Sequence, residues 1–345
     1  MSLPFGQPAP WFTAATPSNP QFVFDTAAGR YVLLLFLPEE PEARAGSLRA
    51  LAAHQALFDD ARASAFVILR DPTAVQGARD LPGVRWMTDR SGRITERYGP
   101  EPHWLLLDPT LRVMAAEPIA EAEAMFRRIA ALPAPGEHAG APLHAPVLVA
   151  PRIFEPELCE ALIAQHQALG GEFTGVMRDK GDRTELVMDE LKRRRDIRVE
   201  DPELQAAIRE RLERRLFPLI KLAFDFGVTE VERYLVSCYD ADDQAVFHPH
   251  RDNTTHATAH RRFACSLNLN DDFTGGDLRF AEYGPAAYRA PPGGAVVFSC
   301  TMMHEALPVT AGRRYAFLPF FYDDAAAQVL AAYQARTAEP QGASA

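Results

Sequence analysis

Four residues in the last third of the chain have the types and spacing of a metal site. His250 and Asp252 lie two residues apart, and His304 and Arg314 follow them. On a β-strand, residues two apart point to the same face, and a return strand can bring a second histidine beside them. Two imidazoles and one carboxylate can hold ferrous iron on one face and leave the opposite face open. The pattern therefore predicts His250, Asp252 and His304 as ligands of an iron site for oxidative chemistry.

Arg314 is a candidate for binding a carboxylate group. On a strand that faces the same cavity, its guanidinium can hold a carboxylate through two parallel hydrogen bonds. Arg313 is the competitor for this role, because it directly precedes Arg314. Either histidine alone would more often be a hydrogen-bonded structural residue, so the prediction depends on all four residues occurring in order.

The segments around these residues resemble the prolyl 4-hydroxylase-type Fe(II)/2-oxoglutarate oxygenases. The resemblance runs in order over about residues 146–323, through Tyr239, His250–Asp252, Leu269–Phe280, Pro292–Phe298 and His304–Tyr315. It implies that His250, Asp252 and His304 bind iron, and that Arg314 binds the distal carboxylate of 2-oxoglutarate.

Three further residues are placed by the same resemblance. The Arg-Tyr pair of the family matches Arg314 and Tyr315, which favours Arg314 over Arg313. Tyr239 resembles a tyrosine that hydrogen-bonds the co-substrate in some members. Asn268 either points into the barrel toward the co-substrate or is a polar residue that fills the barrel.

The resemblance implies an oxidoreductase, a 2-oxoglutarate-dependent dioxygenase that hydroxylates an unactivated C–H bond and releases succinate and CO₂. Its cofactors would be Fe(II), 2-oxoglutarate and O₂, with L-ascorbate as a candidate reductant. The expected substrate is a prolyl or other amino-acid side chain in a protein or peptide. Two alternatives stay open: a hydroxylase of a free amino acid or small metabolite, and a non-catalytic sensor or scaffold that binds iron and 2-oxoglutarate.

The elements expected around the site are helices followed by many short strands. A strand near 147–154 and helices over 155–169 and from Asp201 onward come first, the latter with an apolar stripe from Leu204 to Ile220. Strands are predicted over 233–239, 245–250, 262–269, 278–280, 295–298 and 314–321. Such an order favours a double-stranded β-helix, or jelly roll, with flanking helices.

The first part of the chain instead alternates strand and helix signals. Continuous apolar runs at 31–37, 65–69 and 104–108 are typical of buried strands, and 43–61 and 120–131 have helical spacing. This alternation predicts an α/β domain. The whole chain is therefore expected to be α/β plus mainly β.

Residues 4–132 resemble a peroxiredoxin-type thioredoxin fold, through Gly6–Phe12, Phe36–Pro38, Thr88-Asp89, Tyr98-Gly99 and Leu107-Asp108. The family carries Pro-x-x-x-Thr-x-x-Cys after its first buried strand. Here the series from Pro38 puts Glu42 at the threonine position and Ala45 at the cysteine position. Alanine cannot form the thiolate that attacks peroxide. This thioredoxin-like domain is therefore expected to be catalytically silent, with a structural, dimerising or substrate-presenting role.

A Pro-, Gly- and Ala-rich stretch from Pro133 to Pro142 reads as a linker in a chain of 345 residues. The expected organisation is a redoxin-like domain over 1–134, a linker over 135–145, the dioxygenase domain over 146–325 and a C-terminal helix and tail over 326–345. A homodimer could form through the first domain.

The formal net charge of −10 argues against a nucleic-acid or anionic-membrane binder, since both need a positive field. The exception is Lys192–Arg195, interpreted as a solvated helix end or loop, or else as a patch that attracts an acidic substrate. Residues 175–198 are polar and long for a connection, and read either as a mobile lid or as a surface excursion without a role.

The four cysteines, Cys159, Cys238, Cys265 and Cys300, are scattered and fit a reducing compartment. A peroxidase that uses one of them, such as Cys159, is a minor rival. The N-terminus lacks the basic start and apolar run of a secretory signal, and no segment has the length of a membrane span. The expected location is the cytoplasm.

Overall fold

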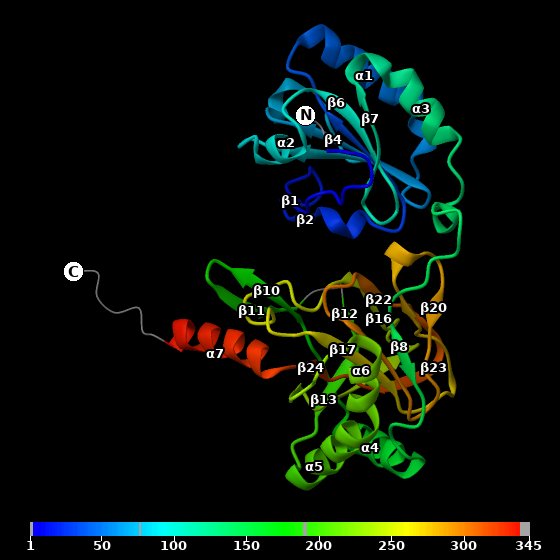
Figure 1. Ribbon diagram of the computed structural model, residues 1–345, viewed down its shortest axis with the longest axis vertical. Coiled ribbons are helices and arrows are strands. Elements are labelled where there is room, and N and C mark those ends of the chain that lie inside the picture. The colour runs from blue at the N-terminus through cyan, green and yellow to red at the C-terminus, as the bar shows by residue number, and fades with distance from the viewer. Residues whose placement is uncertain (1–2, 76, 189–191, 339–345) are drawn as a thin grey trace, which may run out of the picture. The chain divides into compact units, whose positions relative to one another are not determined.

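The computed structural model describes residues 3–75, 77–188 and 192–338, which form two units (Figure 1). One unit holds the described residues up to Ala145 together with Phe280–Ala286. The other runs from Pro146 to Arg279 and continues from Ala287. The predicted tail after the last helix falls on residues 339–345, outside the described part of the chain.

The first unit is built on a five-stranded sheet in the order β5-β4-β3-β6-β7. The strands β3 (Tyr31–Phe36), β4 (Ala63–Leu69) and β5 (Val84–Thr88) are parallel. The strands β6 (His103–Leu107) and β7 (Val113–Pro118) extend the sheet antiparallel. Every residue of β3, β4 and β6 is buried, because both faces of the sheet are covered.

Helices cover the two faces and divide the apolar side chains into two cores. In Figure 1, α1 (Pro41–Ala53) and α3 (Ala122–Ala130) lie on the same side of the sheet. Leu51 and Phe126 from these helices pack with Leu33 and Leu35. The opposite face of β3 packs with α2 (Arg93–Tyr98), and the short strands β1 (Thr13–Ala14) and β2 (Phe22–Val23) precede this sheet.

The helix predicted over 43–61 is shorter than expected. Glu40 caps α1 by accepting hydrogen bonds from the backbone N–H groups of Glu42 and Ala43, and the helix ends at Ala53. A separate 3₁₀ turn follows at Gln55–Leu57.

Helices α4 (Pro156–Leu169), α5 (Pro202–Arg211) and α6 (Phe217–Phe224), with a π-helical turn at Leu212–Leu216, share a hydrophobic core with the larger sheet of the second unit. The last described helix, α7 (Asp324–Ala338), has only Ala326 buried. The predicted stripe is confirmed, since Ile208, Leu212, Leu216 and Ile220 are all buried in the core. Asp201 caps α5 by accepting from the N–H of Glu203.

The larger sheet of this unit is antiparallel and has the order β14-β24-β17-β23-β15-β13-β9. Its strands in that order are Glu230–Glu232, Phe320–Tyr322, Phe263–Asn268, Val309–Phe317, Leu235–Asp240, Arg195–Arg198 and Glu172–Phe173. Three more strands pair with it, β18 (Phe273–Gly275), β21 (Ala295–Ser299) and β8 (Leu148–Ala150).

The smaller sheet has the order β12-β16-β22-β19-β20. Its strands are Lys192–Arg193, Val246–His250, His304–Ala306, Leu278–Arg279 and Ala287–Tyr288. The many strands in two sheets are consistent with a jelly roll. The strand predicted over 314–321 is instead two strands, β23 and β24, which are separated by Leu318 and Pro319. Strand β23 also begins earlier than predicted, at Val309.

The segment 175–198 is ordered into strands where it is described. The hairpin of β10 (Val176–Lys180) and β11 (Arg183–Val187) is held at Thr184, whose N–H donates to the Tyr333 hydroxyl of α7. Strands β12 and β13 then join one sheet each. The segment predicted as a lid or a surface excursion therefore divides into two parts: the β10–β11 hairpin is a separate and largely exposed two-stranded sheet, whereas β12 and β13 belong to the sheets of the barrel. Residues 189–191 lie outside the described part.

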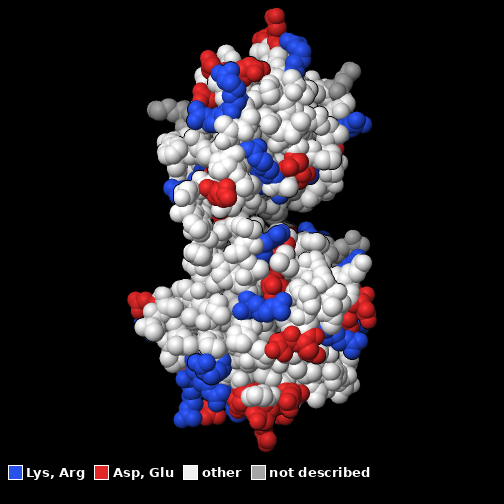
Figure 2. All heavy atoms as spheres, turned by 90° about the vertical axis from the view of Figure 1, so that its right-hand side faces the viewer, with Lys and Arg blue, Asp and Glu red and all other residues white. Residues whose placement is uncertain are grey.

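On the face drawn in Figure 2, basic and acidic side chains are mixed over each unit rather than gathered into one basic surface. Among the described residues, the structure contains no helix with both the length and the apolar character needed to cross a membrane.

Candidate metal centre

The three predicted ligands come together on the smaller sheet of the second unit and in the turn that follows β16. The Nε2 atom of His250 lies 3.5 Å from Oδ1 of Asp252, and the Nε2 atom of His304 lies 3.3 Å from Oδ2. One ligand atom from each residue lies within 4.8 Å of the others. One cation can therefore be reached by all three side chains.

Main-chain carbonyls orient both imidazoles. His250 and His304 are register partners on β16 and β22. Nδ1 of His250 lies 2.7 Å from the carbonyl oxygen of His248, and Nδ1 of His304 lies 3.1 Å from that of Met302. When Nδ1 donates to these carbonyls, Nε2 carries the lone pair that a metal needs.

Asp252 reaches the site by a different route from the one predicted. Strand β16 ends at His250 and its pairing with β22 is irregular between Phe247 and His250. Asp252 lies in the following turn, where its N–H donates to the carbonyl of Cys300 at 3.0 Å. The turn and this hydrogen bond, rather than strand alternation, place its carboxylate beside His250.

The protonation states suit a cation. Burial raises the pKa of Asp252, but His304, His250 and Arg261 together outweigh this effect and hold it well below its usual range. Burial, together with repulsion from His250, lowers the pKa of His304 to about 4. At neutral pH the site therefore offers an ionised carboxylate and a neutral imidazole from His304.

Arg314 lies on the larger sheet with one nitrogen left without a partner. Its Nε donates to Oδ1 of Asn268 at 3.0 Å and its Nη2 donates to the Ser266 hydroxyl at 2.6 Å. Its Nη1 is buried without a hydrogen-bond partner. A buried donor without a partner is costly, and an incoming carboxylate would satisfy it.

Arg313 and Asn268 occupy positions that separate their roles. Arg313 is exposed and its Nε donates to Asp240 at 2.6 Å, so its side chain points away from Arg314. Asn268 also donates to the carbonyl of Ala290 at 2.8 Å, so it is buried as a fixed support of Arg314.

Tyr239 is the register partner of Arg314 on the neighbouring strand β15. The Arg314 guanidinium lies 5.2 Å from the centre of its ring. The Tyr239 hydroxyl accepts a hydrogen bond of 2.7 Å from Nη1 of Arg194. Arg194 is thus part of the site, although it was not among the predicted site residues.

The interpretation of Lys192–Arg195 as a solvated segment is wrong for Lys192 and Arg194, which are buried. Lys192 lies 3.0 Å and Arg194 3.0 Å from Asp196, which also accepts from Ser237 at 2.6 Å. Four consecutive cations indicated a solvated segment, because the carboxylate that compensates them, Asp196, comes only after the run. The side chains alternate between two sides of the strands, so Lys192 and Arg194 point the same way and are both buried.

Three histidines close in sequence to the metal site lie outside it. The His248 side chain is exposed, and only its carbonyl serves His250. His260 is buried with Nε2 2.8 Å from Glu232. His256 is exposed beside Asp179.

The cysteines do not support a peroxidase. All four are free and buried. Burial raises the pKa of Cys159 to about 11 and that of Cys238 to about 11. Thiols of this kind are poor nucleophiles at neutral pH.

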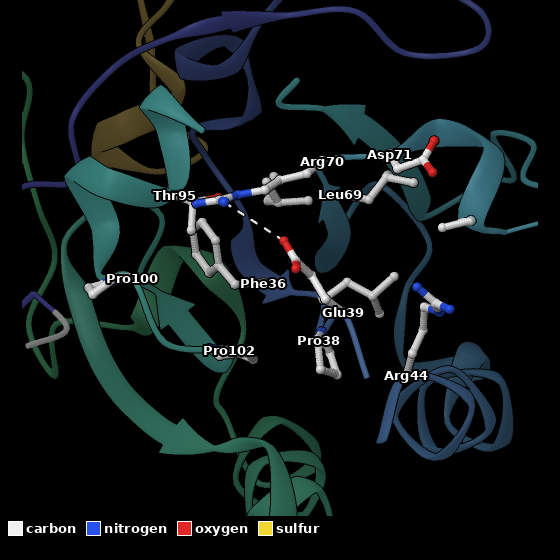
Figure 3. Close-up of a pocket in the computed structure, with 13 residues that line it drawn as sticks. Phe36, Pro38, Glu39, Arg44, Leu69, Arg70, Asp71, Thr95, Pro100 and Pro102 are labelled. Atoms are coloured by element: carbon white, nitrogen blue, oxygen red, sulfur yellow. Dashed lines mark ion pairs between the residues drawn. The ribbon is translucent and has the colours of Figure 1, made fainter. Parts of the chain in front are cut away.

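A pocket of about 590 Å³ lies in the first unit, at the carboxyl ends of β3 and β4 (Figure 3). Phe36 and Leu69 are among its apolar walls, and the ion pair between Arg70 and Glu39, 3.7 Å apart, lies across it. Ala45, the residue aligned with the redoxin cysteine, is exposed on α1. No thiol is available in this unit, because its sequence contains no cysteine.

Comparison with known proteins identifies the segment that carries the metal triad. Residues 234–322 match the family described as the 2OG-Fe(II) oxygenase superfamily. Proteins described as PKHD-type hydroxylases from two strains of Synechococcus sp., JA-2-3B'a(2-13) and JA-3-3Ab, are each 29% identical over 93 residues. The match covers 25% of this chain and 41% of each relative, so the chain spans about two fifths of the curated relatives it matches.

Solved structures that match about half of this chain include a prolyl hydroxylase from Trichoplax adhaerens, in complex with a hypoxia inducible factor peptide fragment. It is 16% identical with a TM-score of 0.42, over 54% of this chain and 86% of that protein. A prolyl-4-hydroxylase from Pseudomonas putida is 19% identical with a TM-score of 0.40, over 52% of this chain and 92% of that protein.

The family match implies Fe(II), 2-oxoglutarate and O₂, and the residues present fit them. The two histidines and one aspartate are the ligand types that hold Fe(II) in such oxygenases, and their ligand atoms lie close enough to share one ion. The unpartnered Nη1 of Arg314 suits a carboxylate. Gly276 leaves room beside Arg314, since a Cβ at this glycine would lie 2.9 Å from the Arg314 Cδ. The match supports a 2-oxoglutarate-dependent dioxygenase.

Proposed function

We propose that this protein is an Fe(II)- and 2-oxoglutarate-dependent dioxygenase that hydroxylates an unactivated C–H bond. The observation that carries the proposal is the pairing of the His250-Asp252-His304 set, of which His304 is buried, with the unpartnered Nη1 of Arg314. A metal ligand set alone would suit many reactions. Arg314, on the larger sheet, adds a binding group for a carboxylate and therefore favours reactions that use a dicarboxylic co-substrate.

Each residue has a distinct part. His250, Asp252 and His304 hold the metal, and the carbonyls of His248 and Met302 keep the imidazoles oriented. Arg314 binds the distal carboxylate of 2-oxoglutarate, and Asn268 and Ser266 fix its guanidinium. Tyr239 lies beside Arg314 and contributes a hydroxyl that Arg194 orients.

The iron, when bound, supplies the activation of dioxygen. The overall reaction converts a C–H bond, 2-oxoglutarate and O₂ into the alcohol, succinate and CO₂, so one oxygen atom enters each organic product. The protein residues orient the co-substrate and surround it with apolar side chains, such as Phe247 stacked on His250 with ring centres 3.5 Å apart.

The proposed substrate is a prolyl or other amino-acid side chain in a protein or peptide. The name of the hydroxylase from Trichoplax adhaerens, which was solved with a peptide, is in keeping with this class. A free amino acid or a small metabolite is the alternative. A sensor that binds iron and 2-oxoglutarate without turnover is the non-catalytic rival.

For the first unit we propose a thioredoxin-like module without catalytic cysteine. The sheet order β4-β3-β6-β7, with β3 and β4 parallel and β6 and β7 antiparallel, supports this. Its role would be to present the substrate or to form a homodimer.

The test begins with metal-free protein under anaerobic conditions. Adding Fe(II) and 2-oxoglutarate should produce a metal-to-ligand charge-transfer band in the visible spectrum, and admitting air should produce succinate. L-Ascorbate is included as reductant. The variants His250→Ala and Asp252→Ala should lose both signals, because each removes a ligand.

The variant His248→Ala is the matched control, because its imidazole lies on the same strand but is exposed. It should keep the band. Absence of the band in the unaltered protein would refute the iron and 2-oxoglutarate assignment. A band without succinate, even with peptides and amino acids added, would favour the sensor.

A further inference from the structure

Arg233 is a cation without a counter-ion at the start of strand β15. Among the described residues, no hydrogen bond or ion pair reaches its guanidinium, which lies 5.2 Å from the centre of the Phe320 ring. The side chain is partly buried. Burial, reinforced by repulsion from Arg261 and Arg194, lowers the pKa of Arg233 to about 10. A partly buried cation without a carboxylate partner is less favourable than a paired one.

The two carboxylates nearest to Arg233 are already engaged. Glu232 accepts from both Nε and Nη2 of Arg261, at 2.9 and 2.6 Å, and from His260. Asp196 accepts from Arg194, Lys192 and Ser237. The group formed by these charged side chains contains four cations, Lys192, Arg194, Arg233 and Arg261, and three carboxylates, Asp196, Glu232 and the metal-site residue Asp252, whose charge acts on Arg194 and Arg261. One cation therefore stays in excess, and an added negative charge would balance it.

The backbone also holds Arg233 in an unfavourable conformation. Its φ of 69° is in the left-handed region, which residues other than glycine rarely adopt. Strain of this kind persists only where the surroundings fix the residue, and it is commonest at functional positions.

Arg233 is connected to the metal centre through Arg261. The guanidinium of Arg261 lies 3.9 Å from the centre of the same Phe320 ring. Its Nη1 donates to the carbonyl oxygen of Asp252 at 3.3 Å. On the other side, Arg194 donates to Tyr239 and also experiences the charge of Asp252. Arg314 serves the co-substrate from the far end of β15, where it pairs with Tyr239, whereas Arg233 precedes the first residue of that strand.

We propose that Arg233 binds a carboxylate of the oxidised substrate, so that the substrate carries an acid group near the carbon that is hydroxylated. This deepens the proposed function and rests on it. The free α-carboxylate of an amino acid and the carboxylate of an acidic or C-terminal residue in a peptide offer the same chemistry to a guanidinium.

The test uses the full chain, loaded anaerobically with Fe(II) and 2-oxoglutarate so that Arg314 is already occupied. Acetate is the probe, and acetamide is its neutral match, both at constant ionic strength with chloride. A ligand that binds only the folded state raises the midpoint of thermal unfolding. At ten times its dissociation constant, acetate should raise it by roughly 3 °C, and acetamide should not.

The variant Arg233→Met should lose the response to acetate, while Arg233→Lys should keep part of it. Arg313→Met is the matched control, because Arg313 is exposed and paired with Asp240, and it should respond fully. Without added anion, Arg233→Met should unfold at the same temperature as the unaltered protein or a higher one, since an uncompensated cation has been removed. A purely structural Arg233 would give a less stable variant.

Equal responses to acetate and acetamide, or an undiminished response in Arg233→Met, would overturn the inference. The charge-transfer band is recorded in each sample. If the band forms but acetate has no selective effect, only the assignment of Arg233 fails; if no band forms, the proposed function itself fails.

The source of the carboxylate is distinguished by turnover. Succinate formation is compared between free amino acids and short peptides, each as the acid and as the C-terminal amide. Stimulation by amino acids alone would identify a small substrate, and stimulation by peptides would identify a protein segment. Amides as effective as acids in both sets would contradict the inference.

Discussion

At the scale of single residues, two neighbouring arginines show how burial assigns roles. Arg313 and Arg314 differ by one position, and strand alternation turns them to opposite sides of β23. Arg313 is paired with Asp240 in solvent, whereas Arg314 is buried with one nitrogen unsatisfied. The difference in their surroundings, rather than in their chemistry, is the reason why we propose Arg314 as the residue that binds the carboxylate of 2-oxoglutarate.

We predict that Arg314→Met raises the dissociation constant of 2-oxoglutarate by about 10- to 100-fold, because a charge-assisted pair of hydrogen bonds is lost. Anaerobic titration of the charge-transfer band measures this constant. Arg313→Met should leave it unchanged. The opposite result for the two variants would mean that Arg313, and not Arg314, binds the carboxylate of 2-oxoglutarate.

At the scale of elements, the turn between β18 and β19 shapes the clamp from behind. Gly275 and Gly276 both have positive φ, at 78° and 71°. A Cβ at Gly276 would lie 2.9 Å from Cδ of Arg314 and 2.9 Å from Cγ2 of Val309. The two glycines, which in the sequence indicate only a turn, therefore leave space for the aliphatic part of the Arg314 side chain.

Gly276→Ala should weaken 2-oxoglutarate binding by roughly 10-fold by displacing Arg314, while the iron ligands stay in place. The same band titration applies. Gly181→Ala is the control, since Gly181 also has positive φ, of 63°, but has no atom within 4 Å of the added Cβ. Equal effects of the two variants would attribute the change to backbone strain alone.

A second element-scale feature is the ion cluster that ties the end of β14 to the start of β17. Burial raises the pKa of Glu232, but His260 and Arg261 outweigh this and lower it to about 2. A carboxyl whose folded pKa lies below its unfolded value contributes stability above the unfolded pKa. This contribution is lost as the pH falls from about 4.5 toward 2.

Glu232→Gln should therefore destabilise the protein at pH 7 by on the order of 2 kcal/mol, and the difference should shrink below pH 4.5. Urea unfolding at pH 7, 5, 4 and 3 measures it. A difference that stays constant over this range would show that the carboxylate charge is not responsible.

At the scale of the whole molecule, the residues of the metal centre all belong to one of the two units. All proposed iron and co-substrate residues lie in the second unit, and the first has a pocket but no thiol. If the first unit presents the substrate, it should affect affinity rather than chemistry.

Removing residues 1–140 should raise the KM for substrate and leave uncoupled 2-oxoglutarate turnover in place. The charge-transfer band of the truncated protein establishes that the remaining unit is folded. Unchanged KM with an intact band would exclude a role in presentation.

The sequence by itself determined the parts of this protein that depend on local pattern. Apolar runs predicted β3, β4 and β6, the stripe from Leu204 to Ile220 predicted the long helix, and ordered spacing predicted the group of His250, Asp252 and His304. These signals are local, because the spacing of apolar residues in a strand or helix, and the residues that form turns, can be recognised within a short stretch of sequence.

Tertiary structure decided the parts that depend on distant partners. Lys192 and Arg194 are buried because Asp196, Ser237 and Tyr239 meet them across two strands. His260 is buried because Glu232 faces it, and Asp252 is held by the carbonyl of Cys300. A charged residue in a sequence looks solvated until its counter-ion is known, and pairing between strands far apart in the chain supplies that counter-ion, or, at Arg233, leaves it out.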